Sequence, residues 1–438
     1  MGSLLTIVDP KEVCDSTESA VESSLASTGH FNKLYISVTS IFSMSSSSIR
    51  STQISWLPLL LYSVSVLFAI NKVLVVCGRC LEDQRSLFLQ LNQSLTFSQW
   101  PCSDDPKLVS WNTNTDCCSW KGVTCDRDSG HVIGLDLSGE CISGGVENIS
   151  STLFNLRYLL QSLNLADNYF NSTPIPSGLD KFVNLTILNL SNAGFGGQVP
   201  IEISRLRRLF SLDLSNMPMY ERNQLILENP DLRTLVQDLS GLRISVLMEC
   251  IYQRIREVNG PLDSSLSELS LLSQIDLSQN DLSTEVPIFF ENFINLTSLR
   301  LSDCGLYGKF PNRVLQLRTL QSLDVSENPL LYGFLPEFPL NGSLIQSLVL
   351  YDTSFSGSLP DSIANLSLLS ELRLSSCSFN GSIPSSIIEL NQLELLDLSN
   401  NSFTGPIPPL PETLTLVILS HNMLTGPLLD SREKPRKA

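Results

Sequence analysis

The sequence predicts an α/β repeat solenoid, a curved array of parallel strands with a helical cap at its amino-terminal end. The first observation behind this prediction is a pattern, Leu-x-x-Leu-x-Leu-x-x-(Asn/Cys/Thr)-x-(Leu/Phe)-x-Gly-x-x-Pro, that recurs between Leu272 and Leu424. The second is its period, since the starts at Leu272, Leu296 and Leu320 are 24 residues apart. A unit of this length contributes one short strand and cannot bury its apolar face alone, so neighbouring units must stack.

This pattern and period are typical of leucine-rich repeats. Positions one, four, six and eleven of each unit are apolar and point inward, and the side chain at position nine bonds to turn backbone that would otherwise be unpaired. Cys304 and Cys377 stand at position nine in place of Asn, which gives both a structural explanation. We expect repeat regions over 131–219 and 263–428, with units that begin at Val132, Leu160, Leu185, Leu209, Leu272, Leu296, Leu320, Ile345, Leu369, Leu393 and Leu414.

Between these regions, residues 220–262 do not follow the pattern. Leu242 could begin a unit, but Ser245 would then occupy core position four, and a buried polar group costs about 1 to 3 kcal/mol when it is unpaired. We therefore predict an irregular segment over 220–262. It is either a functional loop or a mis-spliced segment, and the second is favoured because long loops without structure are uncommon.

An apolar stripe precedes the first unit. Leu87, Leu91 and Leu95 recur every four residues and predict a helix that closes the open end of the solenoid. The chain then reads Asp116-Cys117-Cys118-Ser119-Trp120-Lys121-Gly122-Val123-Thr124-Cys125. Together with the repeat, this run resembles the amino-terminal cap of plant extracellular leucine-rich-repeat proteins, a family that includes receptor-like proteins, receptor kinases and polygalacturonase inhibitors.

The resemblance implies a disulfide-bonded cap over 79–130, with Cys80 paired to Cys117 and Cys118 paired to Cys125. An oxidising export pathway favours such bridges. A zinc site built from the same cysteines is the rival interpretation, and it is disfavoured because the sequence has no second C-x-x-C pair and only 3 histidines. Cys102, Cys141 and Cys250 stay unassigned.

The segment before the cap predicts export. Residues 44–78 hold a basic residue, an apolar run and small residues in the order of a secretory signal peptide. The same run is nearly long enough to act as a signal anchor if translation starts at Met1 rather than Met44. Residues 1–43 are a disordered leader in that case, and a wrongly included leader if translation starts at Met44. Sequons predict N-glycosylation at Asn92, Asn148, Asn171, Asn184, Asn189, Asn295, Asn341, Asn365, Asn380 and Asn400.

The other end of the sequence shows no cap after the last unit. Residues 429–438 form a short polar tail, and solenoids need polar terminal units. We therefore expect either an exposed core at this end or a chain that is a fragment.

Composition and motifs exclude several functions. The formal net charge of −16 opposes nucleic-acid binding, because few basic side chains are present to neutralise phosphates. The sequence contains no protein-kinase motif, and its histidines lie in unrelated places without a recognisable acid/base pair. We expect no enzyme activity, no catalytic residue, no cofactor and no metal.

Function must then reside on the surface of the strands. Positions two, three, five, seven and eight of each unit face the concave side, where strands about 4.8 Å apart form a regular polar grid. Arginine and tyrosine are favoured at the centre of interfaces. The candidate ligand-facing residues are Arg300, Asp303, Asp324, Glu327, Tyr351, Asp352, Arg373 and Asp397.

The longer stretch from Cys80 to Gly145 is similar to plant receptor-like proteins of the Verticillium wilt-resistance type. This resemblance implies an extracellular ligand-recognition ectodomain in pathogen sensing and defence signalling, with a protein, peptide or glycan ligand and a co-receptor kinase as partners. It implies a place on the extracellular side of the cell membrane or in the apoplast, with membrane association through the signal anchor or a missing C-terminal helix. The alternative is a secreted inhibitor of fungal polygalacturonase, which shares the same cap and repeat.

Overall fold

The computed structural model describes residues 79–98, 105–144, 153–216, 225–246, 264–340 and 342–426. The solenoid unit comprises Arg79–Asp126 and His131–Ala438, and the described part of the second unit is the turn Arg127–Gly130. The predicted leader 1–43, signal segment 44–78 and tail 429–438 lie outside the described residues.

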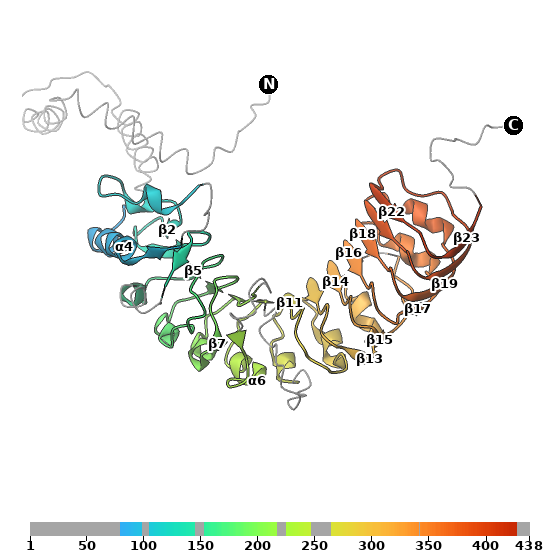
Figure 1. Ribbon diagram of the computed structural model, residues 1–438, viewed down its shortest axis with the longest axis horizontal. Coiled ribbons are helices and arrows are strands. Elements are labelled where there is room, and N and C mark those ends of the chain that lie inside the picture. Colours follow the sequence, from blue (N-terminus) through green and yellow to red (C-terminus); the bar gives the residue numbers. More distant parts are fainter. Residues whose placement is uncertain are drawn as a thin grey trace, which may run out of the picture. The chain divides into compact units, whose positions relative to one another are not determined.

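One sheet of 13 strands runs through the described part of the solenoid (Figure 1). Its first pair, β2 with β3, is antiparallel, and the following neighbours such as β12 and β14 are parallel and in register. β3 begins at the predicted unit start Val132, and each later repeat strand except β10 begins two residues after a predicted start, which confirms the predicted solenoid. The strands are β2 (Val123–Cys125), β3 (Val132–Asp136), β5 (Ser162–Asn164), β6 (Ile187–Asn189), β8 (Ser211–Asp213), β10 (Ile244–Val246), β11 (Gln274–Asp276), β12 (Ser298–Arg300), β14 (Ser322–Asp324), β16 (Ser347–Val349), β18 (Glu371–Arg373), β20 (Leu395–Asp397) and β22 (Leu416–Ile418).

Other strands form smaller sheets further along the units. β1 (Thr96–Phe97) pairs with β4 (Ile142–Ser143) in the cap region. The remaining short strands pair in parallel as β7 with β9, β13 with β15, and β17-β19-β21-β23. Their bounds are β7 (Gly197–Gln198), β9 (Leu225–Ile226), β13 (Tyr307–Lys309), β15 (Leu330–Tyr332), β17 (Ser356–Gly357), β19 (Ser378–Ser382), β21 (Ser402–Pro406) and β23 (Met423–Thr425).

Helices in the described residues are short. A 3₁₀ helix completes most units, and such short helices suit a connection that must turn back toward the next strand. The helices are α4 (Glu82–Ser94), α6 (Leu232–Val236), η1 (Leu108–Ser110), η2 (Cys117–Ser119), η3 (Phe154–Leu156), η4 (Leu179–Lys181), η5 (Ile201–Arg205), η6 (Ser264–Glu268), η7 (Ile288–Asn292), η8 (Asn312–Gln316), η9 (Asp361–Asn365) and η10 (Ser385–Glu389).

The core is a continuous stack of equivalent side chains. Leu296, Leu299 and Leu301, at positions one, four and six of one unit, are all 0% exposed. Burial of each leucine contributes about 1.5 to 3 kcal/mol. Position eleven adds an aromatic layer, in which the rings of Phe379 and Phe403 stack with centroids 6.2 Å apart. Each unit is therefore buried only because both of its neighbours cover it.

Position nine holds adjacent turns together. The Asn328 amide Nδ2 donates to the carbonyls of Leu301, Val325 and Ser326 at 2.8 to 3.0 Å. Its Oδ1 accepts from the backbone N–H of Cys304 at 3.1 Å and of Leu306 at 2.8 Å. One side chain thus satisfies backbone groups of two units inside the core, where water does not reach.

Cysteine performs the same task at this position in two units. The Cys304 thiol donates to the carbonyl of Leu277 at 3.0 Å, and the Cys377 thiol donates to that of Leu350 at 3.1 Å. Both cysteines are free of disulfides. The structural explanation predicted for them is consistent with these contacts.

The described part of the predicted irregular segment is regular, so that prediction is wrong for residues 225–246. β10 continues the sheet, with Ser245 opposite Leu212 on one side and Ile275 on the other. Ser245 is 6% exposed at a core position, and Leu242 before it is 0% exposed, like the unit starts Leu209 and Leu296. Backbone pairing with both neighbours maintains the strand although one side chain departs from the pattern. Residues 220–224 and 247–262 lie outside the described residues.

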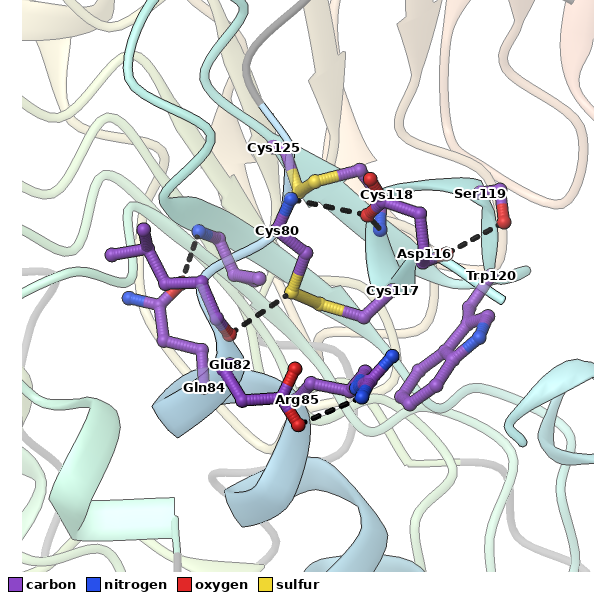
Figure 2. The surroundings of a disulfide bond; sticks show 12 residues. Cys80, Glu82, Gln84, Arg85, Asp116, Cys117, Cys118, Ser119, Trp120 and Cys125 are labelled. Carbon is purple, nitrogen blue, oxygen red and sulfur yellow. Dashed lines mark hydrogen bonds and ion pairs between the residues drawn. A yellow bond between two sulfur atoms is a disulfide. The ribbon is translucent and has the colours of Figure 1, made fainter. Parts of the chain in front are cut away.

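The cap is built on helix α4 and two disulfides (Figure 2). Cys80 bonds to Cys117 and Cys118 bonds to Cys125, as the family resemblance implied. Asp116 Oδ1 accepts from the backbone N–H of both Cys80 and Cys118, at 3.1 and 2.9 Å, which orients the adjacent cysteines toward different partners.

The buried face of α4 differs by one residue from the predicted stripe. Phe88 and Leu91 are fully buried, whereas Leu87 is only partly buried. The ring of Phe88 meets Trp111 edge-on, with centroids 5.4 Å apart. The aromatic partner, which lies 23 positions further along the chain, determines which face of the helix turns inward.

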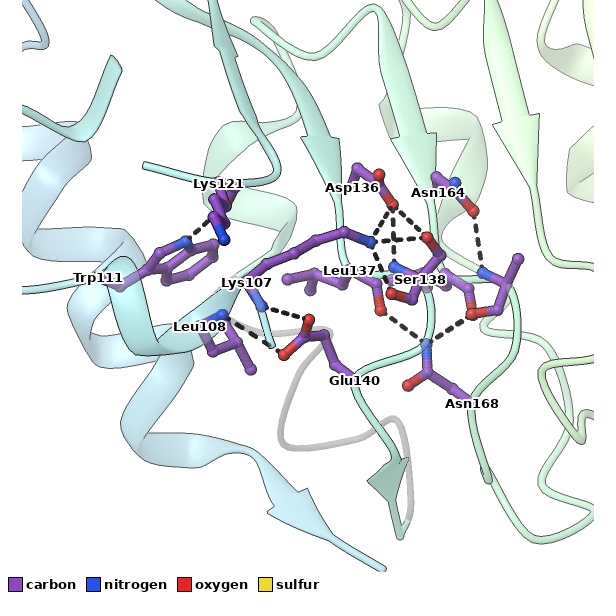
Figure 3. A network of polar contacts seen from close by, with 12 residues as sticks. Lys107, Leu108, Trp111, Lys121, Asp136, Leu137, Ser138, Glu140, Asn164 and Asn168 are labelled. Carbon is purple, nitrogen blue, oxygen red and sulfur yellow. Dashed lines mark hydrogen bonds and ion pairs between the residues drawn. The ribbon is translucent and has the colours of Figure 1, made fainter. Parts of the chain in front are cut away.

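A polar clamp joins the cap to the first unit (Figure 3). Lys107 Nζ donates to Asp136 Oδ1 at 3.2 Å and to the carbonyl and hydroxyl oxygens of Ser138 at 2.6 and 2.8 Å. The carboxylate of Glu140, which is 5% exposed, accepts from the backbone N–H groups of Lys107 and Leu108. Gly122 lies at φ +78°, and a Cβ there would come within 2.2 Å of the Asp136 carbonyl oxygen, so only glycine fits.

We predict that Asn328→Ala lowers the free energy of unfolding by about 3 kcal/mol or more, because several buried backbone groups lose their partner at about 1 to 3 kcal/mol each. Urea unfolding measures the difference. The exposed Asn391→Ala is the matched control and is expected to stay within about 0.5 kcal/mol of wild type. Equal effects of the two substitutions would contradict the role of position nine.

The Asp136 clamp predicts an acid-dependent loss of stability. Burial alone would raise the pKa of Asp136, but hydrogen bonds from Ser138 and Lys107 hold it below its ordinary value of 3.8. A lowered folded pKa stabilises the fold above the ordinary value, and this contribution disappears as the pH falls through the folded pKa. The difference in urea midpoint between wild type and Asp136→Asn should therefore be constant near neutral pH and shrink below about pH 4. A difference that does not change with pH would refute this assignment.

Candidate ligand-binding surface

A shallow depression lies on the face of the main sheet that points away from the core. Its volume is about 410 Å³, and it extends across β11, β12, β14, β16 and β18. Residues from positions three, five, seven and eight of these units line it, as the unit numbering predicts. The lining comprises Asp276, Ser278, Gln279, Arg300, Ser302, Ser322, Asp324, Glu327, Ser347, Val349, Tyr351, Glu371 and Arg373.

Aspartates at position five have a structural role. Asp324 Oδ1 accepts from the backbone N–H of Ser326 at 3.1 Å and from its hydroxyl at 2.6 Å. The same pair of hydrogen bonds, from the serine at position seven to the aspartate at position five, recurs at Asp213 and at Asp397. Burial raises the pKa of Asp324, and the Ser326 hydrogen bonds oppose that rise. These carboxylates therefore fix the strand end of their own unit.

Position five holds a residue other than aspartate in three of the five units that line the depression. Arg300 and Arg373 replace the carboxylate with a guanidinium, and Val349, 7% exposed, replaces it with an apolar side chain. None of these three side chains can accept the position-seven hydrogen bond. Apolar side chains also stand at position five outside the depression, at Val246 and Ile418, whereas arginine at this position occurs only at Arg300 and Arg373 among the described repeat strands, so the two arginines mark where the surface is specialised.

Cross-strand contacts order the polar side chains of the depression. The Tyr351 hydroxyl donates to Glu327 Oε1 at 2.5 Å, and this hydrogen bond, with burial, raises the pKa of Tyr351. Glu371 accepts from Arg373 Nε at 2.6 Å and from the Ser347 hydroxyl at 2.7 Å. Arg300 Nη1 lies 3.8 Å from Asp276 Oδ2. The side chains are thus positioned by protein contacts before any ligand arrives.

Position eight carries a backbone constraint. Asp303, Glu327 and Asp352 lie at φ +51°, +56° and +53°, in the left-handed region that Asp and Asn tolerate better than most residues. The equivalent residues Asp167, Gln279 and Asn400 share this conformation. A polar residue at this position therefore has a conformational explanation, independent of any ligand.

The structure divides the predicted ligand-facing residues into two groups. Arg300, Asp324, Glu327, Tyr351 and Arg373 line the depression, whereas Asp303, Asp352 and Asp397 do not belong to its lining. Ligand binding by the residues of either group stays a prediction.

Sequence reasoning missed Glu371. Glu371 stands at position three of its unit, which was expected to face the concave side, so its position in the repeat could have identified it as a candidate. Its contact to Ser347 depends on the register between neighbouring strands, which the sequence does not display.

The cysteines offer no reactive or metal-binding group in the described residues. Burial raises the pKa of Cys304 to about 12, so the thiol stays protonated at neutral pH and is a poor nucleophile. Cys80, Asp116, Cys117 and Cys118 have ligand atoms within 4.8 Å of one another, but their sulfurs are in disulfides and cannot act as thiolates. Cys141 is also disulfide-bonded, whereas Cys102 and Cys250 lie outside the described residues.

The sequons largely avoid this surface. Asn189 and Asn400 stand on strand-face positions, and no sequon occupies such a position between them. Asn171, Asn295 and Asn380 are exposed elsewhere. Asn92, Asn184 and Asn365 are half-buried, and Asn148 and Asn341 lie outside the described residues. Glycosylation at all of these sites stays a prediction.

Comparisons with known proteins agree with this architecture. Family models match as "Leucine rich repeat N-terminal domain" over residues 81–126 and "Leucine Rich Repeat" over residues 368–390 and 392–414. Receptor-like protein 6 of Arabidopsis thaliana is 40% identical over 253 residues, which are 58% of this chain and 22% of that protein. Receptor-like protein 7 of the same plant is 40% identical over 252 residues, or 57% of this chain and 22% of that protein.

A solved structure shows the same fold. The leucine-rich-repeat ectodomain of the Arabidopsis thaliana receptor kinase GASSHO1/SCHENGEN3, in complex with CASPARIAN STRIP INTEGRITY FACTOR 2, superimposes with a TM-score of 0.55 at 30% identity. The match covers 77% of this chain and 44% of that chain. The chain therefore spans less than half of that ectodomain and about a fifth of the two receptor-like proteins.

The cap, the repeats and the strand surface together define a leucine-rich-repeat fold with a disulfide-bonded amino-terminal cap. The chain is similar to plant receptor-like proteins, among them Receptor-like proteins 6 and 7. No helix among the described residues has the length and apolar character needed to cross a membrane.

Substitutions at position five separate structural from specialised residues. Asp324→Ala should lower the free energy of unfolding by about 1 to 2 kcal/mol, because the Ser326 backbone N–H and hydroxyl lose a charged acceptor. Arg373→Ala should change it by less than about 0.5 kcal/mol, because its ion pair with Glu371 is solvent-exposed. Urea unfolding of the two variants tests the contrast. A cost at Arg373 as large as that at Asp324 would show that the arginine is structural.

Proposed function

We propose that the chain is the ligand-recognition ectodomain of a plant receptor-like protein and acts in pathogen sensing and defence signalling. The observation that carries this proposal is the strand-face depression, where Arg300, Val349 and Arg373 replace the structural aspartate of the repeat. A protein that needed only a scaffold would have no reason to place two half-exposed arginines together on one surface. Interfaces favour arginine and tyrosine at their energetic centres, and Tyr351 lies between the two arginines along the sheet.

The distribution of sequons supports the same surface. Large glycans at Asn189 and Asn400 would lie toward the two ends of the strand face, and the surface between them would stay accessible. The GASSHO1/SCHENGEN3 ectodomain, which shares the fold, binds a factor in the structure cited above. An extracellular protein, peptide or glycan that crosses the strands is therefore the expected class of ligand.

Signalling would require a partner. The matched relatives are named receptor-like proteins, and a co-receptor kinase is the proposed route for a signal to the cell interior. The proposed location is the apoplast or the extracellular side of the cell membrane, with a signal anchor or a C-terminal helix as the means of attachment. The matched relatives are receptor-like proteins, which favours this function over inhibition of a fungal polygalacturonase.

Ligand capture tests the proposal. The secreted, glycosylated chain is immobilised and exposed to plant extracellular fluid and to fungal culture filtrate, and bound molecules are identified by mass spectrometry. We expect the triple variant Arg300→Ala, Tyr351→Ala, Arg373→Ala to lose at least about 90% of the specific ligand, because interface anchors carry most of the binding free energy.

The matched control changes the same residue types elsewhere. Tyr158, Arg205 and Arg207 are exposed and lie outside the depression, and the triple alanine variant at these positions should capture ligand like wild type. Equal capture by both triple variants would overturn the proposed surface. Retention and inhibition of a fungal polygalacturonase would instead favour the inhibitor alternative.

A further inference from the structure

The two arginines of the depression keep unused hydrogen-bond donors. A guanidinium has five N–H donors. Arg373 uses its Nε for Glu371, and Arg300 Nη1 lies 3.8 Å from Asp276, beyond hydrogen-bond distance. Among the described residues, no other acceptor engages either guanidinium. Both groups are about half exposed, at 56% and 41%. The protein therefore presents two incompletely paired cations to the depression.

The carboxylates of the same depression are already engaged by protein donors. Glu371 accepts with both oxygens, and Glu327 accepts from the Tyr351 hydroxyl. Asp276 and Asp324 each accept from the position-seven residue of their own unit. Although these four acids outnumber the two arginines, the donors available to a ligand lie at the arginines. In the described part of the chain, Asp276, Asp324 and Glu327 each keep one oxygen without a protein donor, and those of Asp324 and Glu327 lie on the strand and turn between the two arginines.

The spacing of these groups follows from the sheet. Arg300 and Arg373 both occupy position five, on β12 and β18, with β14 and β16 between them. Three strand spacings of about 4.8 Å place the two positions about 14 Å apart. Asp324 and Glu327 belong to the unit next to Arg300. Across the sheet, the side chains are thus positive in the unit of β12, negative in that of β14, apolar in that of β16, and positive in that of β18. Val349 and Tyr351 are the apolar side chains.

An extended peptide matches this sequence of charges. Its side chains at i, i+2 and i+4 point to the same side, and about 3.3 Å per residue places i and i+4 about 13 Å apart. A residue at i+2 is then near the middle of the span. Carboxylates are the groups that guanidinium donors bind most strongly, often through two parallel hydrogen bonds.

We propose that the depression binds an extended peptide segment of the form acidic-x-basic-x-acidic, which lies across β12 to β18. The first acidic side chain pairs with Arg300, the basic side chain with Asp324 and Glu327, and the second acidic side chain with Arg373. This proposal rests on the proposed function, because it names the ligand class of the same surface.

Synthetic peptides test the charge pattern directly. The acetylated and amidated heptapeptide Ser-Asp-Ser-Lys-Ser-Asp-Ser is titrated into the full secreted chain by isothermal calorimetry at low ionic strength. We expect binding with a dissociation constant below about 1 mM. The charge-inverted peptide Ser-Lys-Ser-Asp-Ser-Lys-Ser, and a peptide with the two aspartates only two residues apart, should bind at least about tenfold more weakly.

Arginine variants locate the peptide. Arg300→Gln and Arg373→Gln should each weaken the heptapeptide at least about tenfold, whereas Arg207→Gln, an exposed arginine outside the depression, should leave the affinity unchanged. Thermal unfolding of each variant confirms that the fold is intact.

Results that contradict the peptide proposal can be distinguished from results that contradict the proposed function. No heptapeptide binding at about 1 mM, or tighter binding of the charge-inverted peptide, would overturn the acidic-x-basic-x-acidic pattern. If the strand-face triple variant still lost its extracellular ligand, the proposed function would stand without this pattern. If heptapeptide binding survived both arginine substitutions, the assigned contacts would be wrong.

Discussion

The turns of this solenoid have to satisfy their backbone hydrogen bonds inside an apolar core, and the side chain at position nine does so in units such as those of Asn168, Asn328 and Asn401. Asn328 alone makes five hydrogen bonds to the backbone of its own unit and the preceding one. Stacking of the leucines at positions one, four and six is possible only because these turns close without water. Cys304 shows what the constraint demands, since its thiol reaches the same kind of carbonyl that an amide does. The parallel sheet, and with it the surface, depends on this ladder.

The repeat leaves few positions for function. Positions one, four, six and eleven are buried, position nine bonds to the turns, and position eight is restricted by its left-handed backbone. Aspartate at position five is likewise engaged by position seven, as in Asp324. A specialised surface is therefore detectable as a departure from these roles. Arg300 and Arg373 are such departures, whereas Asp397 is a repeat feature that looks like a site only when its contacts are unknown.

Sequence periodicity predicted the fold well because the period itself encodes strand spacing and burial. It failed at 225–246 because a strand is held by backbone pairing on both sides, and Ser245 at one core position does not break that pairing. The α4 stripe was displaced toward Phe88 because the aromatic partner Trp111 is distant in sequence. Of the surface, the residue types were predictable and the contacts were not. Glu371 bonds across the register to Ser347, and spacing within one unit cannot reveal a partner in the next.

Net charge is a poor guide to what such a surface binds. The chain carries a formal charge of −16, which alone would predict a basic ligand. At the depression, however, protein donors engage at least one oxygen of each carboxylate, whereas the guanidinium groups keep most of their donors. Within a few ångströms, directional hydrogen bonds in a partly desolvated site outweigh the distant charges, which are screened over about 8 to 10 Å at physiological salt. The local pairing state of each side chain, rather than the sum of charges, therefore determines the ligand chemistry of this face.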